Sequence, residues 1–225
     1  MIVRRIDLMP VRDHPGRMTV TPMFPLEVAM LPGEELPLRI FEPRYLALVS
    51  DCMAMPEPAF GVVLIAAGRE VGGGDKRCDV GTLARIIDCQ DFGANRYRLM
   101  CVLGERIRVQ QWLDDAPYPR ADIEPWPDEP GEPADPSQVA AVEERIVALF
   151  DLIGEASGKP VPSRDIVAAA GLDPDNRLYA LAARVPMGQA DRYSVLSAPT
   201  EAARLAALSE AVDTVTAMVE FQLSE

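Results

Sequence analysis

Charged and aromatic side chains are concentrated in one short segment of the chain. LPLRIFEPRY, residues 36–45, contains five charged or aromatic residues within seven positions: Arg39, Phe41, Glu42, Arg44 and Tyr45. Arginine and aromatic residues carry much of the binding energy at protein interfaces. The segment is therefore a candidate contact surface. The alternative is structural: Glu42 and Arg44 pair with each other, and the segment forms a corner of the fold.

Residues that catalyse reactions or hold cofactors do not form a recognisable set. The segment GEASGKP, residues 154–160, is one residue short of a phosphate-binding loop, and Pro160 stands where that loop needs Ser or Thr. The single histidine, His14, lies in a polar segment, and neither Lys76 nor Lys159 lies in a strained turn with a serine that it could activate. The cysteines and carboxylates show no metal-ligand spacing. The sequence thus predicts no catalytic residue, no cofactor and no metal.

The composition is that of a globular protein with an acidic balance. The 225 residues are 48% hydrophobic and 25% charged, with a formal net charge of −13. An acidic chain repels phosphate backbones, which argues against nucleic acid as a general partner. No apolar run approaches the roughly 20 residues of a membrane helix, and the N-terminus lacks the apolar core of a secretory signal. We expect a cytoplasmic protein with no membrane partner and with four reduced cysteines.

Short strands are predicted for the first half of the chain. Residues 60–66, 80–88, 95–103 and 105–113 are rich in β-branched residues or alternate charged with apolar side chains. Because no helix separates most of these segments, a sandwich or barrel is favoured over a parallel sheet. The glycine-rich residues 66–79 predict a mobile loop.

The opening segment is predicted to change from strand to helix. Leu36, Leu38 and Ile40 alternate with other residues, as on a strand whose apolar side fills a barrel. Pro37 indicates an edge strand or a bulge, because proline cannot donate a ladder hydrogen bond. Pro43 suits the first turn of a helix, and apolar residues follow it at helical spacing.

Helices are predicted for the second half. Residues 125–137 are rich in proline and acid and predict an extended linker. Beyond them, apolar stripes at helical spacing cover residues 139–153 and 205–219, with two shorter helices between them at 163–172 and 174–185. The two stripes predict the inner faces of a helical bundle, and a dimer seam is the alternative.

One family resemblance ties these segments together. MFPLEVAMLPGEELPLRIFEPRYLALV, residues 23–49, resembles the start of the N-terminal, substrate-binding domain of Lon proteases. Residues 61–65, 80–86, 96–109 and 118–129 resemble later segments of that domain in order, and 190–208 resembles its helical end. The resemblance implies the α+β class, with a PUA-like β pseudo-barrel followed by an α-helical bundle. It suggests an N-terminal arm or extra strand over 1–21, the β domain over 22–126, a linker over 127–137 and the helical domain over 138–225.

The resemblance also implies a function. In Lon this domain captures unfolded polypeptide, and an ATPase and a Ser–Lys protease domain follow it. The resemblance therefore implies a set of candidate peptide-binding residues, in which an exposed Phe41 or Tyr45 beside Arg39 and Arg44 would anchor the peptide: Arg39, Phe41, Glu42, Arg44 and Tyr45. The chain ends near where that continuation would start, so we expect a standalone, non-catalytic module that hydrolyses neither ATP nor protein. A peptidase label transferred from full-length Lon would not describe it. Unfolded or partly unfolded polypeptides are the expected partners, together with a separate Lon-type ATPase.

Two other functions stay open at this stage. PUA-like barrels often bind RNA, and five arginines on predicted strands could share one face: Arg85, Arg96, Arg98, Arg106 and Arg108. Clustering of these side chains would favour RNA, whereas alternation with acidic residues would not. A small-molecule-binding regulatory role is the second alternative, because barrels often hold pockets.

Overall fold

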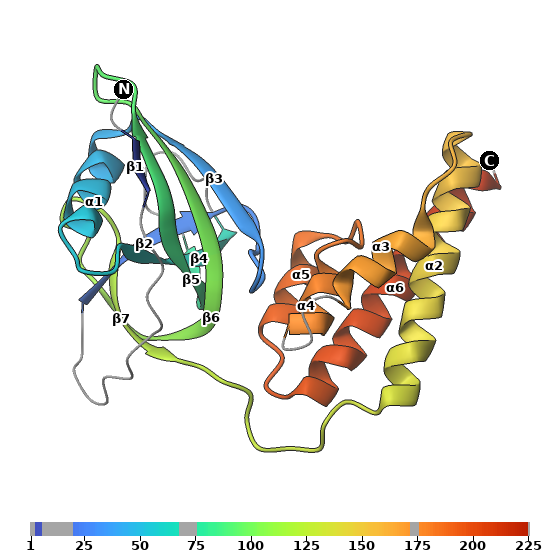
Figure 1. Ribbon diagram of the computed structural model, residues 1–225. Helices are drawn as coiled ribbons and strands as arrows, with labels where there is room; N and C mark the ends of the chain where they lie inside the picture. The colour runs from blue at the N-terminus through green and yellow to red at the C-terminus, as the bar shows by residue number, and fades with distance from the viewer. Residues whose placement is uncertain (1–2, 6–19, 68–75, 172–175, 225) are drawn as a thin grey trace. The chain divides into compact units, whose positions relative to one another are not determined.

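The contacts within the chain separate two units (Figure 1). The computed structural model describes residues 3–5, 20–67, 76–171 and 176–224. The first unit is Met1–Pro127 and the second is Asp128–Glu225. Each unit has its own set of buried apolar side chains.

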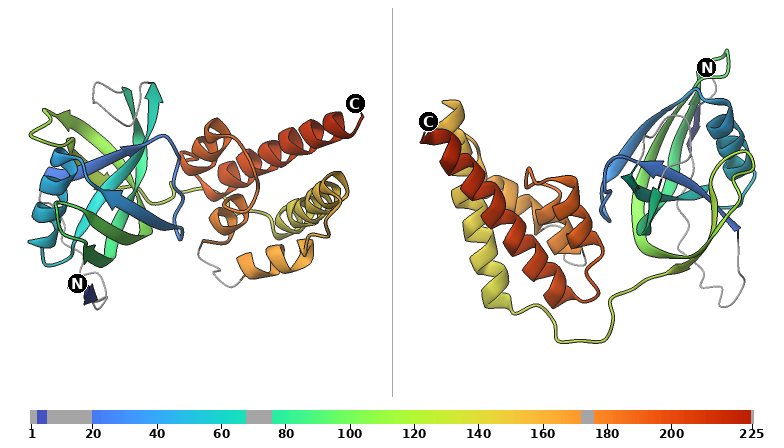
Figure 2. Two further views of the ribbon diagram at one scale, coloured as in Figure 1. Left: turned by 90° about the horizontal axis from the view of Figure 1, so that it is seen from above. Right: turned by 180° about the vertical axis from the view of Figure 1, so that it is seen from behind.

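In its described residues, the first unit is a seven-stranded sheet that closes on itself. Its elements are β1 (Val3–Arg5), β2 (Val20–Leu26), β3 (Glu35–Ile40), α1 (Pro43–Met53), β4 (Ala59–Ala67), β5 (Lys76–Asp91), β6 (Tyr97–Leu113) and β7 (Arg120–Pro125). β2 pairs in parallel with β4, and antiparallel pairings lead from β4 through β5, β6 and β7 back to β2. β1 lies alongside β5, and β3 alongside β6. The predicted pseudo-barrel and the α+β class are confirmed (Figure 2).

The barrel core combines the inward side chains of the strands with one face of α1. On β6, Leu99, Cys101 and Leu103 are buried at every second position, because successive side chains of a strand point to opposite faces. α1 adds Tyr45 to the same cluster, where its ring stacks on that of Phe24 with 4.1 Å between centroids. The helix that interrupts the strand pattern therefore supplies part of the core.

The predicted corner between β3 and α1 is confirmed. Pro43 occupies the first turn of α1. Leu36 and Ile40 are buried in the core, and Leu38 packs against it while partly exposed. β3 is an edge strand of the sheet, which is where Pro37 is tolerated.

Some predictions fall on residues outside the described ranges. The arm or extra strand expected over residues 1–21 is described only as β1 and the first residues of β2, which begins at Val20. His14 and most of the loop expected at 66–79 lie outside the described residues. Lys76 was expected in that loop, but it is the first residue of β5.

All regular elements in the described part of the second unit are helices. Its helices are α2 (Pro136–Ser157), α3 (Ser163–Ala170), α4 (Arg177–Ala182), α5 (Gln189–Leu196) and α6 (Glu201–Leu223). α2 and α6 lie side by side (Figures 1 and 2). Their predicted stripes are largely buried within the unit, at Val142, Ile146, Leu149, Leu205, Leu208 and Val212. This burial favours a bundle interior over a dimer seam. No helix in the described residues is long and apolar enough to span a membrane.

The ends of α2 follow ordinary capping rules. Asp135 accepts hydrogen bonds from the hydroxyl and the N–H of Ser137 at the start of α2, and these bonds lower the pKa of its carboxyl group. Gly158 ends α2 with a left-handed φ of 65°, a conformation that favours glycine.

One helix of this unit, α5, was not predicted from the sequence. Its sequence, QADRYSVL, is mostly polar, so the apolar period that identifies helices is weak there.

The predicted linker is anchored rather than free. It contains neither helix nor strand between β7 and α2. The N–H of Trp126 donates to the carbonyl of Arg106 at 2.9 Å. Further along, Asp128 forms a two-bond ion pair with Arg204 of α6. Proline and acid in the sequence indicated an irregular path correctly, but they did not reveal these anchors.

Candidate peptide-binding site

The five predicted contact residues are divided between the outside and the inside of the corner. Arg39 and Phe41 are exposed, and 64% of the Phe41 surface is accessible. Glu42 and Arg44 are half-buried and pair with each other, with 3.1 Å between Nε and Oε2. Tyr45 is only 3% exposed. The expectation that Tyr45 could present its ring to a ligand is therefore corrected.

Tyr45 is buried because the first turn of α1 faces the barrel core. Its ring stacks on Phe24, and the guanidinium carbon of Arg44 lies 4.4 Å from its centroid. The Glu42–Arg44 ion pair holds that guanidinium beside the ring. These three residues thus fit the structural alternative, and only Arg39 and Phe41 face outward.

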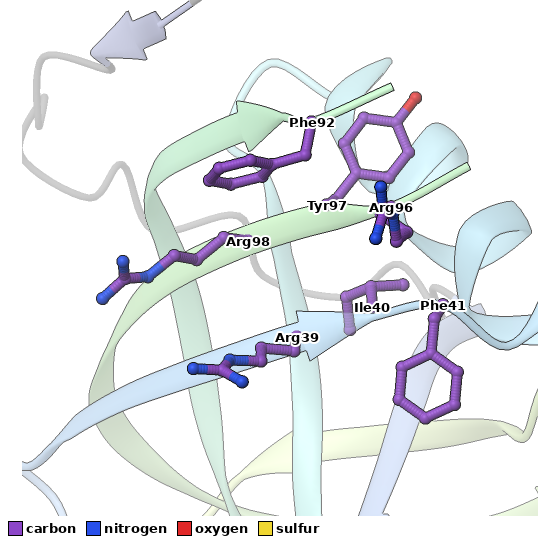
Figure 3. A pocket seen from close by; sticks show the side chains of 7 residues that line it. All are labelled: Arg39, Ile40, Phe41, Phe92, Arg96, Tyr97 and Arg98. Atoms are coloured by element: carbon purple, nitrogen blue, oxygen red, sulfur yellow. The ribbon is translucent and has the colours of Figure 1, made fainter. Parts of the chain in front are cut away.

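Arg39 and Phe41 line a pocket of about 580 Å³ together with residues from β6 and the turn before it (Figure 3). We call it the arginine–aromatic pocket, lined by Arg39, Ile40, Phe41, Phe92, Arg96, Tyr97 and Arg98. The register of β3 on β6 creates it, because that register sets Arg39 opposite Arg98 and Ile40 opposite Tyr97. Residues almost 60 positions apart therefore meet on one surface.

The turn between β5 and β6 places Phe92 and Arg96 at this pocket. The N–H of Phe92 donates to the carbonyl of Arg96 at 3.0 Å, and the carboxylate of Asp91 accepts the N–H of Gly93 at 2.7 Å. The three residues from Gly93 to Asn95 have positive φ, as in tight turns that favour Gly and Asn. Phe92 is held at this turn with 54% of its surface exposed.

Three guanidinium groups line the same pocket. Figure 3 shows those of Arg39 and Arg98 extending in the same direction from neighbouring strands. Within the described ranges, the side chains of Arg39, Arg96 and Arg98 form no ion pair or hydrogen bond. The pocket therefore concentrates unpaired positive charge on a protein of net charge −13. Such a local field attracts an anionic group.

A second pocket adjoins the first. Its volume is about 400 Å³, and it lies between α1 and β5, lined by Val49, Ser50, Met53, Ala54, Cys89, Asp91 and Tyr97. Tyr97 lines both pockets. Most of the second pocket is apolar, in contrast to the arginines of the first.

Comparison with known families identifies the chain. Residues 20–214 match the family described as the ATP-dependent protease La (LON) substrate-binding domain. The chain belongs to this Lon substrate-binding domain family. It is 32% identical over 107 residues to a Lon protease of Anaeromyxobacter dehalogenans and 29% identical over 106 residues to Lon protease 2 of Myxococcus xanthus. Each match covers 47% of this chain but only 13% of the longer Lon protease.

Two solved structures share the Lon-domain architecture. A Lon N-terminal domain protein from Xanthomonas campestris is 28% identical, with a TM-score of 0.58, and the match covers 84% of this chain and 96% of that one. The N-terminal domain of a Mycobacterium avium complex Lon protease aligns over 92% of this chain and 99% of that one, with a TM-score of 0.51. At 14% identity, this second likeness supports the fold alone.

The remaining arginines of this Lon domain do not form the common face that RNA binding would need. Arg85 pairs with Glu105 at 2.6 Å. Arg106 and Arg108 pack on the ring of Trp126, with guanidinium carbons 4.3 and 3.9 Å from its centroid. Of the five arginines considered for RNA, only Arg96 and Arg98 line the arginine–aromatic pocket.

Sequence reasoning missed two aromatic members of the site, Phe92 and Tyr97. Phe92 stands in DFGAN, where the turn residues were visible but the direction of the ring was not. Tyr97 reaches both pockets only through the pairing of β6 with β3 and β5. Strand register would have been the signal, and a single sequence does not reveal it.

Three of the four thiols, those of Cys52, Cys89 and Cys101, are buried and suit a core role. Burial, together with the charge of Asp51, raises the pKa of Cys52 to about 12. Burial and the neighbouring thiols raise the pKa of Cys101 to about 12. Burial and the nearby carboxylates also raise the pKa of Cys89. A thiol must ionise to act as a nucleophile, so these three remain protonated near neutral pH. Among the described residues, no cluster of His, Cys, Asp and Glu could hold a metal ion.

Proposed function

We propose that this chain is a non-catalytic binding module that holds exposed apolar segments of non-native polypeptides at the arginine–aromatic pocket. The observation that carries the proposal is the pair Phe41 and Phe92, each more than half exposed at one pocket. Exposed large apolar side chains grouped at a concave surface mark interaction sites. Membership of the Lon substrate-binding domain family supports polypeptide as the ligand class.

Side-chain capture is favoured over strand addition at β3. The N–H of Leu103 donates to the carbonyl of Glu34 at 2.9 Å, and bonds to β6 recur at every second residue of an antiparallel strand. The backbone nitrogen of residue 37 therefore points toward the unpaired edge of the sheet. Because residue 37 is proline, it offers no N–H to an incoming strand there. This arrangement blunts the edge for an incoming strand. A polypeptide would bind mainly by placing side chains in the pockets.

The expected affinity is modest. Covering the exposed parts of Phe41 and Phe92 contributes about 1–2 kcal/mol each by the usual value for burying an aromatic side chain. The entropy lost when a disordered chain is held opposes this gain. Dissociation constants in the micromolar range follow, which suits a module that samples many clients and releases them.

The setting of this activity follows from the same features. Four free cysteines are typical of a reducing compartment, so we place the module in the cytoplasm. Its relatives carry the matching region within a longer Lon protease, which makes a separate Lon-type ATPase the natural recipient of a bound client. On this proposal the purified chain hydrolyses neither ATP nor casein, and detectable turnover of either by a homogeneous sample would contradict it.

Fluorescence anisotropy with a labelled, permanently unfolded polypeptide tests the binding proposal, with the folded form of the same polypeptide as reference. We expect saturable binding of the unfolded form only. The double change Phe41→Ala with Phe92→Ala should weaken it at least tenfold. Phe221→Ala is the matched control, because Phe221 of α6 is a phenylalanine with 66% exposure outside the site. Equal loss with the control variant, or no binding of the unfolded form, would overturn the proposal.

A further inference from the structure

We infer that the arginine–aromatic pocket selects acidic segments, in which Asp or Glu stands beside an aromatic or aliphatic side chain. This inference rests on the proposed function and specifies which polypeptide segments the site prefers. Its starting observation is the like-charge pair Arg39 and Arg98, placed directly opposite each other in the β3–β6 register.

A facing pair of arginines is unfavourable in the free protein. Like charges directly opposite in an antiparallel pair repel, and Arg96 adds a third positive charge to the same pocket. Within the described residues, no acidic side chain pairs with any of the three. The chain has 35 acidic residues that could have provided one. Local rules broken in this way are expected at functional sites, where a ligand supplies the missing partner.

A carboxylate fits this partner role. The guanidinium group offers several N–H donors in a planar fork and binds a carboxylate through two parallel hydrogen bonds. Arg39 and Arg98 extend their guanidinium groups in the same direction, so both can reach one acidic segment (Figure 3). Phe41 and Phe92 line the same pocket and would cover the apolar side chain beside the acid.

The second pocket extends the preference. Its lining includes Val49, Met53 and Cys89, and it shares Tyr97 with the arginine–aromatic pocket. An extended chain with a carboxylate at the arginines can therefore place a neighbouring aliphatic or aromatic side chain on the far side of Tyr97. Acid and apolar groups within one short segment satisfy both pockets at once.

A peptide fits better than a nucleic acid. RNA carries a charge on every nucleotide, so the net charge of −13 repels it along its whole length. Of the other strand arginines considered for RNA, Arg85 is paired with Glu105, and Arg106 and Arg108 are packed on Trp126. Of the five, only Arg96 and Arg98 lie at the pocket, and this small positive surface matches the short acidic stretch of a peptide.

Two versions of one unfolded, aromatic-rich polypeptide test the inference, the first with Asp and Glu and the second with Asn and Gln at the same positions. In anisotropy titrations at low salt, we expect the acidic version to bind about tenfold more tightly, the usual order for a charge-assisted contact. Arg39→Gln with Arg98→Gln should abolish this preference, and added salt should reduce it. Arg164→Gln is the control, because Arg164 is an exposed arginine of α3, 3.7 Å from Glu144.

The outcomes separate the inference from the proposed function. Equal binding of both versions, unchanged by Arg39→Gln and Arg98→Gln, would overturn the acidic preference and leave the binding function standing. Failure of both versions to bind would overturn the function, and the inference with it. Displacement of the acidic version by single-stranded RNA at lower concentration than by unlabelled acidic polypeptide would show that the pocket prefers phosphate, and would also overturn the inference. Thermal unfolding of each variant confirms that it is folded.

Discussion

Two groups of arginine and aromatic side chains in the barrel unit use the same residue types in opposite ways. In one, Arg106 and Arg108 pack on Trp126, which is 7% exposed. In the other, the arginine–aromatic pocket, Phe41 and Phe92 are more than half exposed. In the first group, Trp126 covers the arginines, and we call it the closed group. In the second group, the aromatic rings stay accessible to solvent, and we call it the open group.

The pairing of β7 with β6 causes the difference. The residue after β7 continues this antiparallel ladder, so the N–H of Trp126 bonds to the carbonyl of Arg106 at 2.9 Å, which brings the indole onto the two guanidinium groups. No corresponding segment in the described residues covers Arg39 and Arg98. Composition alone therefore does not distinguish a stabilising arginine–aromatic contact from a binding one. The burial of the ring and the pairing of the guanidinium groups distinguish the two kinds of contact. Substitutions in each group test this comparison.

The largest expected effect is on stability, from Trp126→Ala. Removing a buried tryptophan costs about 3–5 kcal/mol of unfolding free energy, and here it also leaves Arg106, which is 5% exposed, without its ring. Urea denaturation followed by circular dichroism measures the change. Phe41→Ala is the counterpart in the open group and should alter the unfolding free energy by less than about 0.5 kcal/mol. A large loss with Phe41→Ala would show that the pocket is part of the core.

The next largest expected effect is a loss of stability at alkaline pH. It comes from the buried thiols of the core and not from either arginine group. Arginine stays charged throughout this range, whereas Cys52 and Cys101 have their pKa raised from 9.0 to about 12 by burial. A thiol whose folded pKa lies above its unfolded value stabilises the fold fully below pH 9, and this contribution is lost as the pH rises toward 12. At pH 10 the loss is on the order of 1 kcal/mol for each thiol.

Denaturation at pH 7.5 and pH 10 measures this dependence. Cys52→Ala should weaken the pH dependence by the share of one thiol, although the variant is less stable at both pH values. Tyr118 has a pKa raised by burial and by its bond to Asp51, so measurements stay at or below pH 10, where the contribution of this phenol is small. A pH dependence unchanged by Cys52→Ala would show that other groups cause the alkaline loss.

The fold was more predictable than the site, because the two depend on different ranges of the sequence. Pro43 at a helix start and the alternation along β6 are local signals, and both were interpreted correctly. Residues 23–49 carried the family resemblance and with it the barrel. α5 was missed because its polar sequence shows no clear apolar stripe.

The site required non-local information. Arg39 and Phe41 were identified from one segment, but Tyr45 was misjudged because its stacking partner, Phe24, lies 21 positions earlier and on another strand. Arg98 and Arg106 have similar neighbours in the sequence, but only Arg106 is covered by Trp126, which continues the β6–β7 ladder. Arg106 is therefore buried, whereas Arg98 is exposed. Register and long-range packing set these outcomes.

Arg39→Glu should convert the open group into a closed one. The introduced carboxylate would face Arg98 across the β3–β6 pair, and replacing like charges by opposite ones there stabilises the fold by about 0.2–1 kcal/mol. The same change removes one guanidinium group and adds a negative charge, so binding of an acidic unfolded polypeptide should fall at least tenfold. Urea denaturation and anisotropy on one preparation measure both. Retained affinity, or a loss of stability, would contradict the account of an unsatisfied arginine pair.

Arg85→Gln should have the smallest effect and defines the baseline for the comparison. Arg85 is paired with Glu105 at 2.6 Å, but both side chains keep solvent contact, at 23% and 41% exposure. Ion pairs of this kind contribute about 0–1 kcal/mol, so the unfolding free energy should change by no more than that. Affinity for unfolded polypeptide should also be unchanged, because Arg85 lines neither pocket. A drop in affinity like that of Arg39→Gln would mean that net positive charge, rather than the placement of three unpaired guanidinium groups, governs binding.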